Sequence, residues 1–177
     1  KITCSGVGLH TGKKVKLTFH PAEPNTGILF RRIDGDKVVD IPATAKNVGE
    51  TTLSTTLVYG DYKISTIEHL LSALAGTGVD NCIIDCDGPE IPIMDGSSTQ
   101  FVFLIQTAGI VEQNAVKKFV YVTKSVQVQR DDAVARIKPY DGFRVTFTLE
   151  FDHPVYNKYP HSASIDFSQT SFIREVS

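Results

Sequence analysis

Hydrophobic and polar residues alternate along several stretches of the chain, which is the pattern of a β-strand with one buried face. In residues 13–21 (KKVKLTFHP), Val15, Leu17 and Phe19 fall on one side and the residues between them on the other. Residues 143–154 (FRVTFTLEFDHP) show the same alternation and also close on His-Pro. This similarity is too short to establish an internal duplication by itself.

Similar runs predict further strands, and three stretches favour helices. The predicted strands cover residues 28–32, 38–41, 51–57, 62–65, 81–87, 119–129, 133–139 and 163–167. The first predicted helix covers residues 67–75 and ends at the glycines that follow it. The second starts near Ser97, which has capping-box spacing with Gln100, and ends at Gly109. A third begins within residues 168–177.

Strands with interspersed helices predict an α+β fold. A polar stretch at residues 110–118 (IVEQNAVKK) reads as a linker, so we expect one domain in residues 1–115 and a second in residues 116–177. The chain begins without a methionine and its last predicted helix is not completed. We therefore expect the second domain to be truncated here and the chain to be part of a longer protein.

Composition narrows the classes of partner. The 177 residues carry a formal net charge of −2, and no basic run is longer than a pair, which argues against nucleic acid as a partner. No apolar segment approaches the roughly 20 residues that a transmembrane helix needs. The three cysteines include no CxxC pair, and the spacing of Cys82 and Cys86 puts both on one face of a strand. We expect these thiols to be small buried side chains.

The first predicted helix carries an acidic and an imidazole side chain next to each other, Glu68 and His69. At 100° per residue, His69 falls nearly opposite the apolar stripe of this helix, and Glu68 falls at its flank. Ser65 and Glu68 have the S-x-x-E spacing of a capping box, which would give Glu68 a purely structural role. A lone histidine on a helix is most often a surface residue. The pattern alone leaves both readings open.

Other polar residues carry weaker signals. His10 lies in a turn between glycines (GVGLHTG), where backbone amides could hold an anion, although a plain tight turn explains the pattern as well. Asp95 (PIMDGS) precedes a helix and suits a turn or cap. His20 and His153 each precede a proline at the end of a strand and are predicted to be structural. His161 lies in a polar loop and gives no signal.

Several motifs together resemble one enzyme family. SGVGLHTGKKV, ISTIEHLLSALAGTGVDN and PEIPIMDGSSTQFV, in this order, followed by KKFVYV, KPYDGF and FDHP, are similar to the zinc-dependent UDP-3-O-acyl-N-acetylglucosamine deacetylases of lipid A biosynthesis. The similarity covers nearly all of the chain. It implies two similar α+β domains, each with helices layered against a sheet as in domain 2 of ribosomal protein S5, and a cytoplasmic location in a Gram-negative bacterium.

The resemblance also implies a reaction and a set of site residues. The family removes an acetyl group from a UDP-linked acylated glucosamine, with Zn²⁺ held by two histidines and an aspartate. His69 matches the first of these histidines, and Glu68 matches the general base that takes a proton from the attacking water. The positions that match the substrate site are Leu53, Ser54, Glu150 and Phe151, with less defined roles for His10 and Asp95. Contact with a membrane would be peripheral, through the lipid part of the substrate.

The family's other two zinc ligands come from an H-x-x-x-D motif, which this sequence lacks: Asn157 lies four residues after His153, and Ile165 four after His161. A single imidazole cannot hold zinc tightly, so we expect these 177 residues alone to be inactive and the remainder of the same protein to complete the site. Two alternatives remain open at this point: a non-catalytic sugar-nucleotide-binding module derived from that fold, and an α+β interaction domain without a small ligand.

Overall fold

The computed structural model describes residues 1–150, 153–167 and 169–177. The chain divides into two compact units. Unit 1 consists of Lys1–Ala115 together with Phe172–Ser177, and unit 2 consists of Val116–Ser171.

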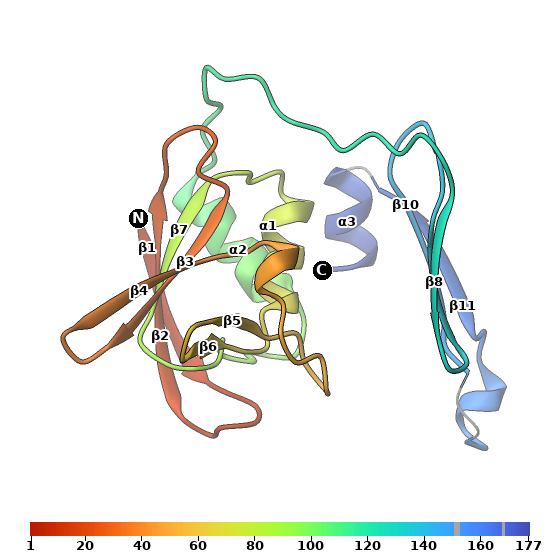
Figure 1. Cartoon of the computed structure of the whole chain (residues 1–177), viewed down its shortest axis with the longest axis horizontal. Helices are drawn as coiled ribbons and strands as arrows, with labels where there is room; N and C mark the ends of the chain where they lie inside the picture. Colours follow the sequence, from red (N-terminus) through yellow and green to blue (C-terminus); the bar gives the residue numbers. More distant parts are fainter. Residues whose placement is uncertain (151–152, 168) are drawn as a thin grey trace. The chain divides into compact units, whose positions relative to one another are not determined.

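Unit 1 is built on one five-stranded sheet with the order β1-β2-β7-β3-β4 (Figure 1). Neighbouring strands are antiparallel, except that β3 and β7 are parallel. The strands are β1 (Ile2–Val7), β2 (Lys14–Pro21), β3 (Ile28–Asp34), β4 (Lys37–Pro42) and β7 (Cys82–Cys86). The alternation predicted in residues 13–21 is confirmed, because Val15, Leu17 and Phe19 are buried.

Two helices, α1 (Glu68–Gly76) and α2 (Thr99–Ala108), lie on the same side of this sheet (Figure 1). Their buried side chains and the inward residues of the strands form the core of unit 1. The side chains with 0% exposed surface in this core include Leu17, Phe30, Ile41, Ile64, Leu70, Ile84, Ile91 and Phe101. One sheet face and two helical stripes thus make a layered α+β core, as the sequence predicts.

Some local predictions for unit 1 were wrong. Residues 51–57 do not form a strand: residues 51–56 are irregular, and β5 (Leu57–Tyr59) pairs with β6 (Tyr62–Ile64) as a small hairpin, with one further bridge from Leu57 to Val48. The strand β1 was not predicted. A short 3₁₀ helix at Ala45–Asn47 connects β4 to the irregular segment. The threonines and serines between 51 and 56 favour a strand by pattern, but their backbone hydrogen bonds are made with neighbouring loops.

The predicted helix caps also differ. α2 begins at Thr99, two residues after Ser97, and the Ser97 hydroxyl accepts the backbone N–H of Thr99 at 3.1 Å. No side-chain capping bond forms at Ser98, the residue preceding the helix. The predicted capping box between Ser97 and Gln100 is therefore wrong, whereas the helix end at Gly109, with a φ of 82°, is confirmed. None of the helices in the described ranges is long and apolar enough to cross a lipid bilayer.

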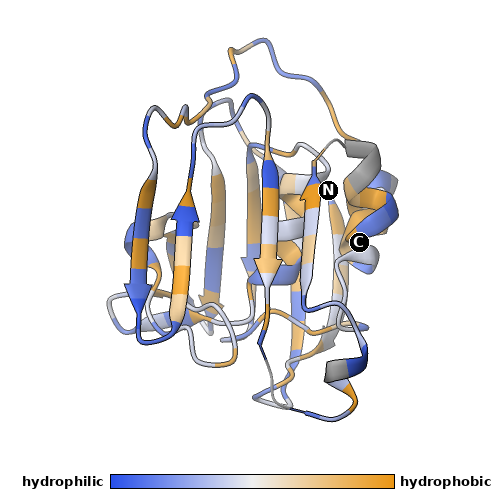
Figure 2. Ribbon diagram, turned by 90° about the vertical axis from the view of Figure 1, so that its right-hand side faces the viewer, coloured by the Kyte–Doolittle hydropathy of each residue, from blue (hydrophilic) through white to orange (hydrophobic). Residues whose placement is uncertain are grey.

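Unit 2 contains two antiparallel hairpins. β8 (Val126–Arg130) pairs with β9 (Ala133–Ile137), and β10 (Arg144–Thr148) pairs with β11 (Ser162–Asp166). Residues 119–125 do not join the strand predicted for residues 119–129. Hydrophobic and hydrophilic residues alternate along these strands, as the colours in Figure 2 show, yet nearly all of them are exposed.

The last helix, α3 (Gln169–Glu175), confirms the helix expected in residues 168–177. Its Phe172 is buried, with 3% of its surface exposed, and belongs to unit 1. The Phe172 ring lies so close to Gly76 of α1 that a β-carbon added there would come within 2.2 Å of it. The glycine at the end of α1 therefore makes room for an aromatic side chain from a segment about a hundred residues later.

Candidate functional site

Glu68 and His69 form the first turn of α1, and neither caps that helix. No side-chain capping bond forms at Ile67, the residue before the helix. Oε2 of Glu68 instead accepts the backbone N–H of Thr55 at 3.0 Å, and the Ser65 hydroxyl donates to the carbonyl of Pro89 at 3.3 Å. The capping box considered for Ser65 and Glu68 is therefore wrong, because Glu68 binds a loop from another part of unit 1.

This loop brings two further predicted residues to the start of α1. Leu53 and Ser54 directly precede Thr55, which also accepts the N–H of Ile67 through its carbonyl at 3.4 Å. Leu53 is 86% exposed and has a positive φ of 59°, whereas Ser54 is half-buried. The Leu53 side chain is thus a large apolar group held in solvent, two residues before the Thr55 N–H that binds Glu68, on a backbone that is strained for a non-glycine residue.

One carboxylate oxygen of Glu68 and the ring nitrogens of His69, the atoms that could bind a water or a metal, make no hydrogen bond within the described residues. Both side chains are half-buried. Across the part of the chain that the structure describes, no hydrogen bond reaches Oε1 of Glu68 or the ring nitrogens of His69. One carboxylate oxygen of Glu68 is therefore held, whereas its other oxygen and the imidazole of the next residue have no hydrogen-bond partner within the described residues.

The donor set around His69 tests whether unit 1 could hold a metal by itself. An imidazole is a usual zinc ligand, but a zinc site needs three or four ligands. Among the described residues, no group of three or more His, Cys, Asp or Glu side chains is placed to hold one ion. His69 can thus contribute one ligand, and the described residues do not complete the set.

His10 lies in the turn after β1, and its side chain is exposed. Its backbone N–H donates to Oε1 of Glu90 at 2.9 Å, and the N–H of Thr11 donates to Oε2 of the same residue at 2.8 Å. The turn therefore does hold an anion, as one of the two readings allowed, but this anion is a carboxylate of the protein. These two amides are not available to a substrate.

Glu90 was not predicted from the sequence. It has no exposed surface, and the Thr66 hydroxyl also donates to its Oε1 at 3.1 Å. Burial raises the pKa of this carboxyl, but the hydrogen bonds from His10, Thr11 and Thr66 outweigh it and hold the pKa below its usual value. The sequence feature that could have pointed to Glu90 is a single acidic residue between a proline and an isoleucine in PEIPI.

Asp95 is exposed and is held by the residues that follow it. Its Oδ1 accepts the backbone N–H of Ser97 at 3.0 Å and the Ser97 hydroxyl at 2.9 Å, which lowers the pKa of the Asp95 carboxyl. The segment that carries Asp95 starts beside the His10 turn, because the N–H of Ile93 donates to the carbonyl of Val7 at 3.0 Å. The structure thus groups the segments of His10, Asp95 and Glu68 within unit 1.

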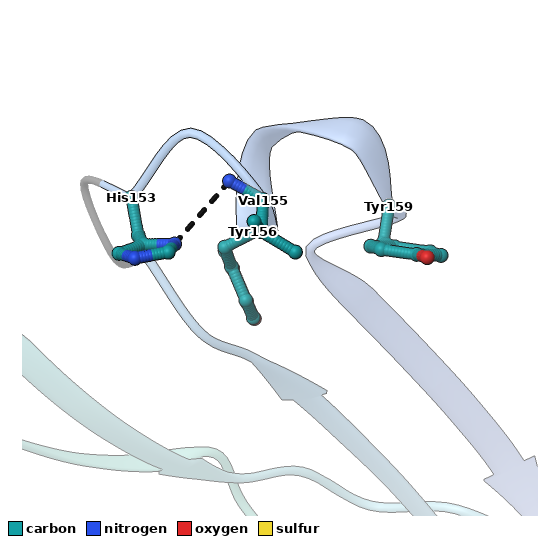
Figure 3. Close-up of a pocket in the computed structure, with 4 residues that line it drawn as sticks. All are labelled: His153, Val155, Tyr156 and Tyr159. Carbon is teal, nitrogen blue, oxygen red and sulfur yellow. Dashed lines mark hydrogen bonds between the residues drawn. The ribbon is translucent and has the colours of Figure 1, made fainter.

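Two predicted residues belong to unit 2. Glu150 is exposed, and Phe151 lies outside the described residues. Shortly after them in the chain, His153, Val155, Tyr156 and Tyr159 line a hollow of about 470 Å³ (Figure 3). Within it, the N–H of Val155 donates to Nδ1 of His153 at 3.2 Å. His153 thus has a local structural role, as predicted.

Other polar and thiol groups of unit 1 are structural. Nε2 of His20 lies 2.7 Å from Oδ2 of Asp85 on the neighbouring strand, which confirms the structural prediction for His20. Cys4, Cys82 and Cys86 are free thiols, and the last two are buried, as predicted. Burial raises the pKa of each thiol to about 11, so none is a reactive thiolate near neutral pH.

A comparison with protein families matches residues 1–177 to the LpxC family, described as UDP-3-O-acyl N-acetylglycosamine deacetylase. The chain belongs to this family. The match spans the His10 turn, the first turn of α1 and the Asp95 segment, so the family relationship covers all the candidate residues. It also confirms the resemblance inferred from the motifs.

Individual LpxC relatives support the same assignment. The chain is 58% identical over 175 residues to the UDP-3-O-acyl-N-acetylglucosamine deacetylase of Methylococcus capsulatus and 57% identical over 177 residues to that of Saccharophagus degradans. It is 54% identical over 176 residues to that of Coxiella burnetii. These alignments cover 99%, 100% and 99% of this chain, but in each case 58% of the relative. The chain thus spans somewhat more than half the length of these curated relatives.

Proposed function

We propose that the full-length protein hydrolyses the acetamide of a UDP-3-O-acyl-N-acetylglucosamine, in the pathway that makes lipid A. The observation that carries this proposal is the family match over residues 1–177, which includes Glu68 and His69. The open carboxylate oxygen and the open imidazole at the start of α1 fit the roles that the family implies. The chain described here supplies the first part of the site.

In this proposal Glu68 is the general base. Amide hydrolysis requires a proton to leave the attacking water, and a positioned carboxylate can accept it. The N–H of Thr55 holds Oε2 of Glu68 at 3.0 Å, which fixes the direction of the carboxylate and leaves Oε1 for the water. Half-burial of the side chain limits the number of positions it can adopt.

His69 would contribute one ligand to a Zn²⁺ ion. When bound, such an ion supplies Lewis-acid polarisation of the amide carbonyl. The adjacency of Glu68 and His69 on one helical turn would keep the proton acceptor at a constant distance from that ligand. The other ligands would come from the remainder of the protein, in keeping with the greater length of its relatives.

The substrate would be recognised by groups near this turn and by unit 2. We propose that Leu53 and Ser54 line the substrate site, that Phe151 contacts the uridine, and that Glu150 lies near it. His10 and Asp95 would line the site from the turn after β1 and from the segment before α2. The exposure of Leu53, at 86%, supports this assignment, because an apolar side chain in solvent gains most from contact with a ligand. We further propose that the two units are similar domains, with boundaries at residues 115 and 116.

The test uses the full-length protein, with release of acetate from the UDP-linked substrate and zinc content as separate readouts. Glu68→Gln should lower kcat by roughly 10²- to 10⁴-fold, the range for a general base, and leave zinc content unchanged. His69→Ala should lower both zinc content and activity. As a matched control, His20→Ala removes an imidazole paired with Asp85 and should leave zinc content unchanged.

The alternative of a non-catalytic sugar-nucleotide-binding module predicts different results. Such a protein would bind UDP with no zinc and release no acetate, and His69→Ala would not change its affinity for UDP. Undiminished activity in Glu68→Gln would exclude this residue as the base. The 177-residue chain by itself should be inactive in the same assay, since it supplies one metal ligand from the described residues.

A further inference from the structure

Glu90 is a carboxylate with no exposed surface that joins two segments far from each other in the sequence. Its Oε1 accepts the N–H of His10 at 2.9 Å and the hydroxyl of Thr66 at 3.1 Å. Its Oε2 accepts the N–H of Thr11 at 2.8 Å. One side chain thus binds the turn after β1 and the residue that precedes α1 by two positions.

The surroundings of Glu90 are built to accept a carboxylate. Burying such a group is unfavourable unless its oxygens receive hydrogen bonds, and here three donors point at two oxygens. Gly8 provides the space, because a β-carbon at this position would lie 2.4 Å from Oε2 of Glu90 and 2.5 Å from the Thr11 hydroxyl. The three hydrogen bonds and the absence of a side chain at Gly8 thus together accommodate the Glu90 carboxylate.

The same residue is tied by its backbone to the start of α1. The N–H of Ser65 donates to the carbonyl of Pro89, and the N–H of Ile91 donates to the carbonyl of Ser65, both at 2.9 Å. The next residue, Thr66, has a positive φ of 57°, which is strained for a β-branched side chain. The bond from the Thr66 hydroxyl to Glu90 gives this strained residue a fixed partner, two positions before the helix that begins with Glu68.

We propose that Glu90 is a positioning residue, which fixes the first turn of α1 and the His10 turn relative to each other. This rests on the proposed function, in which Glu68 and His69 act from that first turn. Glu90 is buried and its oxygens are occupied, so it acts through these neighbours and does not contact the substrate. Its effect should therefore fall on the geometry of catalysis more than on substrate binding.

The first experiment is Glu90→Gln in the full-length protein. The amide has the same shape, but its NH₂ group replaces an acceptor oxygen and would face a donor. We expect kcat to fall roughly 10- to 100-fold, the effect of a displacement of about 1 Å at a reacting group, while KM stays within about threefold. Hydrogen exchange should become faster in peptides that contain His10–Thr11 and Thr66–Leu70. Ile41→Val, a core change on β4, is the control for lost stability and should change neither kcat nor these exchange rates.

A pair of variants at Thr66 tests the same link without altering the carboxylate. Thr66→Ser keeps the hydroxyl donor and should keep kcat near that of the wild type. Thr66→Val keeps the shape, removes the donor and should lower kcat, by less than Glu90→Gln does. If Glu90→Gln fails to fold, this pair decides the question by the same two readouts.

The outcomes separate the two proposals. An active wild-type protein whose Glu90→Gln or Thr66→Val variant keeps both kcat and the exchange rates overturns the positioning role and leaves the deacetylase function standing. A wild-type protein that releases no acetate overturns the proposed function. Faster exchange at both peptides in Glu90→Gln would still show the link between the two turns in that case, because exchange does not depend on activity.

Discussion

In unit 1, the strands of the central sheet bury one face under α1 and α2, whereas β8, β9 and β10 of unit 2 are exposed at every residue. Both units have the same alternation of hydrophobic and polar residues. Phe30 of β3 has no exposed surface, while Phe147 of β10 is 64% exposed. The comparison shows that alternation predicts a strand with a face suited to burial, but the cover has to come from another element.

In unit 1, the helices α1 and α2 of this chain pack on the apolar face of the sheet. For the apolar faces of the unit 2 strands, we expect the packing elements to lie in the remainder of the protein. The relatives are longer, since the chain covers 58% of each. Unit 1 should thus be stable by itself, whereas the hairpins of unit 2 should gain most of their stability in the complete protein. Isolated two-stranded hairpins are marginally stable in water, which supports this expectation.

The largest expected difference between the two units is the loss of stability when a phenylalanine of each is replaced by alanine. In the 177-residue chain, Phe30→Ala should destabilise unit 1 by about 3–5 kcal/mol, because it leaves a cavity in a closed core. Phe147→Ala should change stability by less than about 0.5 kcal/mol. Urea unfolding followed by hydrogen exchange in peptides of each unit is a suitable measurement, because it reports residues 1–115 and residues 116–171 separately. Comparable losses in the two variants would contradict the difference between the units.

The next effect depends on the rest of the protein. In the full-length protein, Phe147→Ala should cost about 2 kcal/mol or more if its ring becomes covered. Lys138→Ala, a change of an exposed polar residue in the same unit, is the control and should have little effect. Urea or thermal unfolding would measure both. A Phe147 variant as stable as the wild type would mean that this face of unit 2 stays in solvent.

A smaller effect tests whether the end of α3 is part of unit 1. Gly76→Ala adds a β-carbon that would lie 2.2 Å from the Phe172 ring, so it should cost about 1–3 kcal/mol through overpacking. In a Phe172→Ala background the same change should be nearly neutral. A double-mutant cycle measured by urea unfolding gives the coupling. Equal costs of Gly76→Ala in the two backgrounds would argue against this contact.

The smallest effect concerns acid. The pKa of Glu90 is lower in the folded state than its ordinary value of 4.5, so its stabilisation of unit 1 is complete above that value. The stabilisation is lost as the pH falls through the lower, folded pKa. The urea concentration at the unfolding midpoint of unit 1 should therefore decrease as the pH is lowered below about 4.5. Part of this decrease should be absent in Glu90→Gln. An identical pH dependence in the variant would show that other carboxylates cause the loss.

Most of the fold of unit 1 could be predicted because its signals are local. The alternation in residues 13–21 and the helical spacing in residues 67–75 each give the correct element within one or two residues. The strand predicted for residues 51–57 was wrong, because a run of threonine, serine and leucine favours a strand, whereas residues 51–56 form a loop that binds the start of α1. Such tertiary contacts override local preference.

The sequence by itself determined that Glu68 and His69 stand together on one helical turn, and which face of a strand such as β2 is apolar. Only the tertiary structure decided that Glu68 binds Thr55 instead of its own helix, and that Glu90 receives donors from residues 79 and 80 positions away. The reason is physical: periodicity reports how a residue is oriented within its own element. The partner of a buried charge depends on which elements the sheet order brings together.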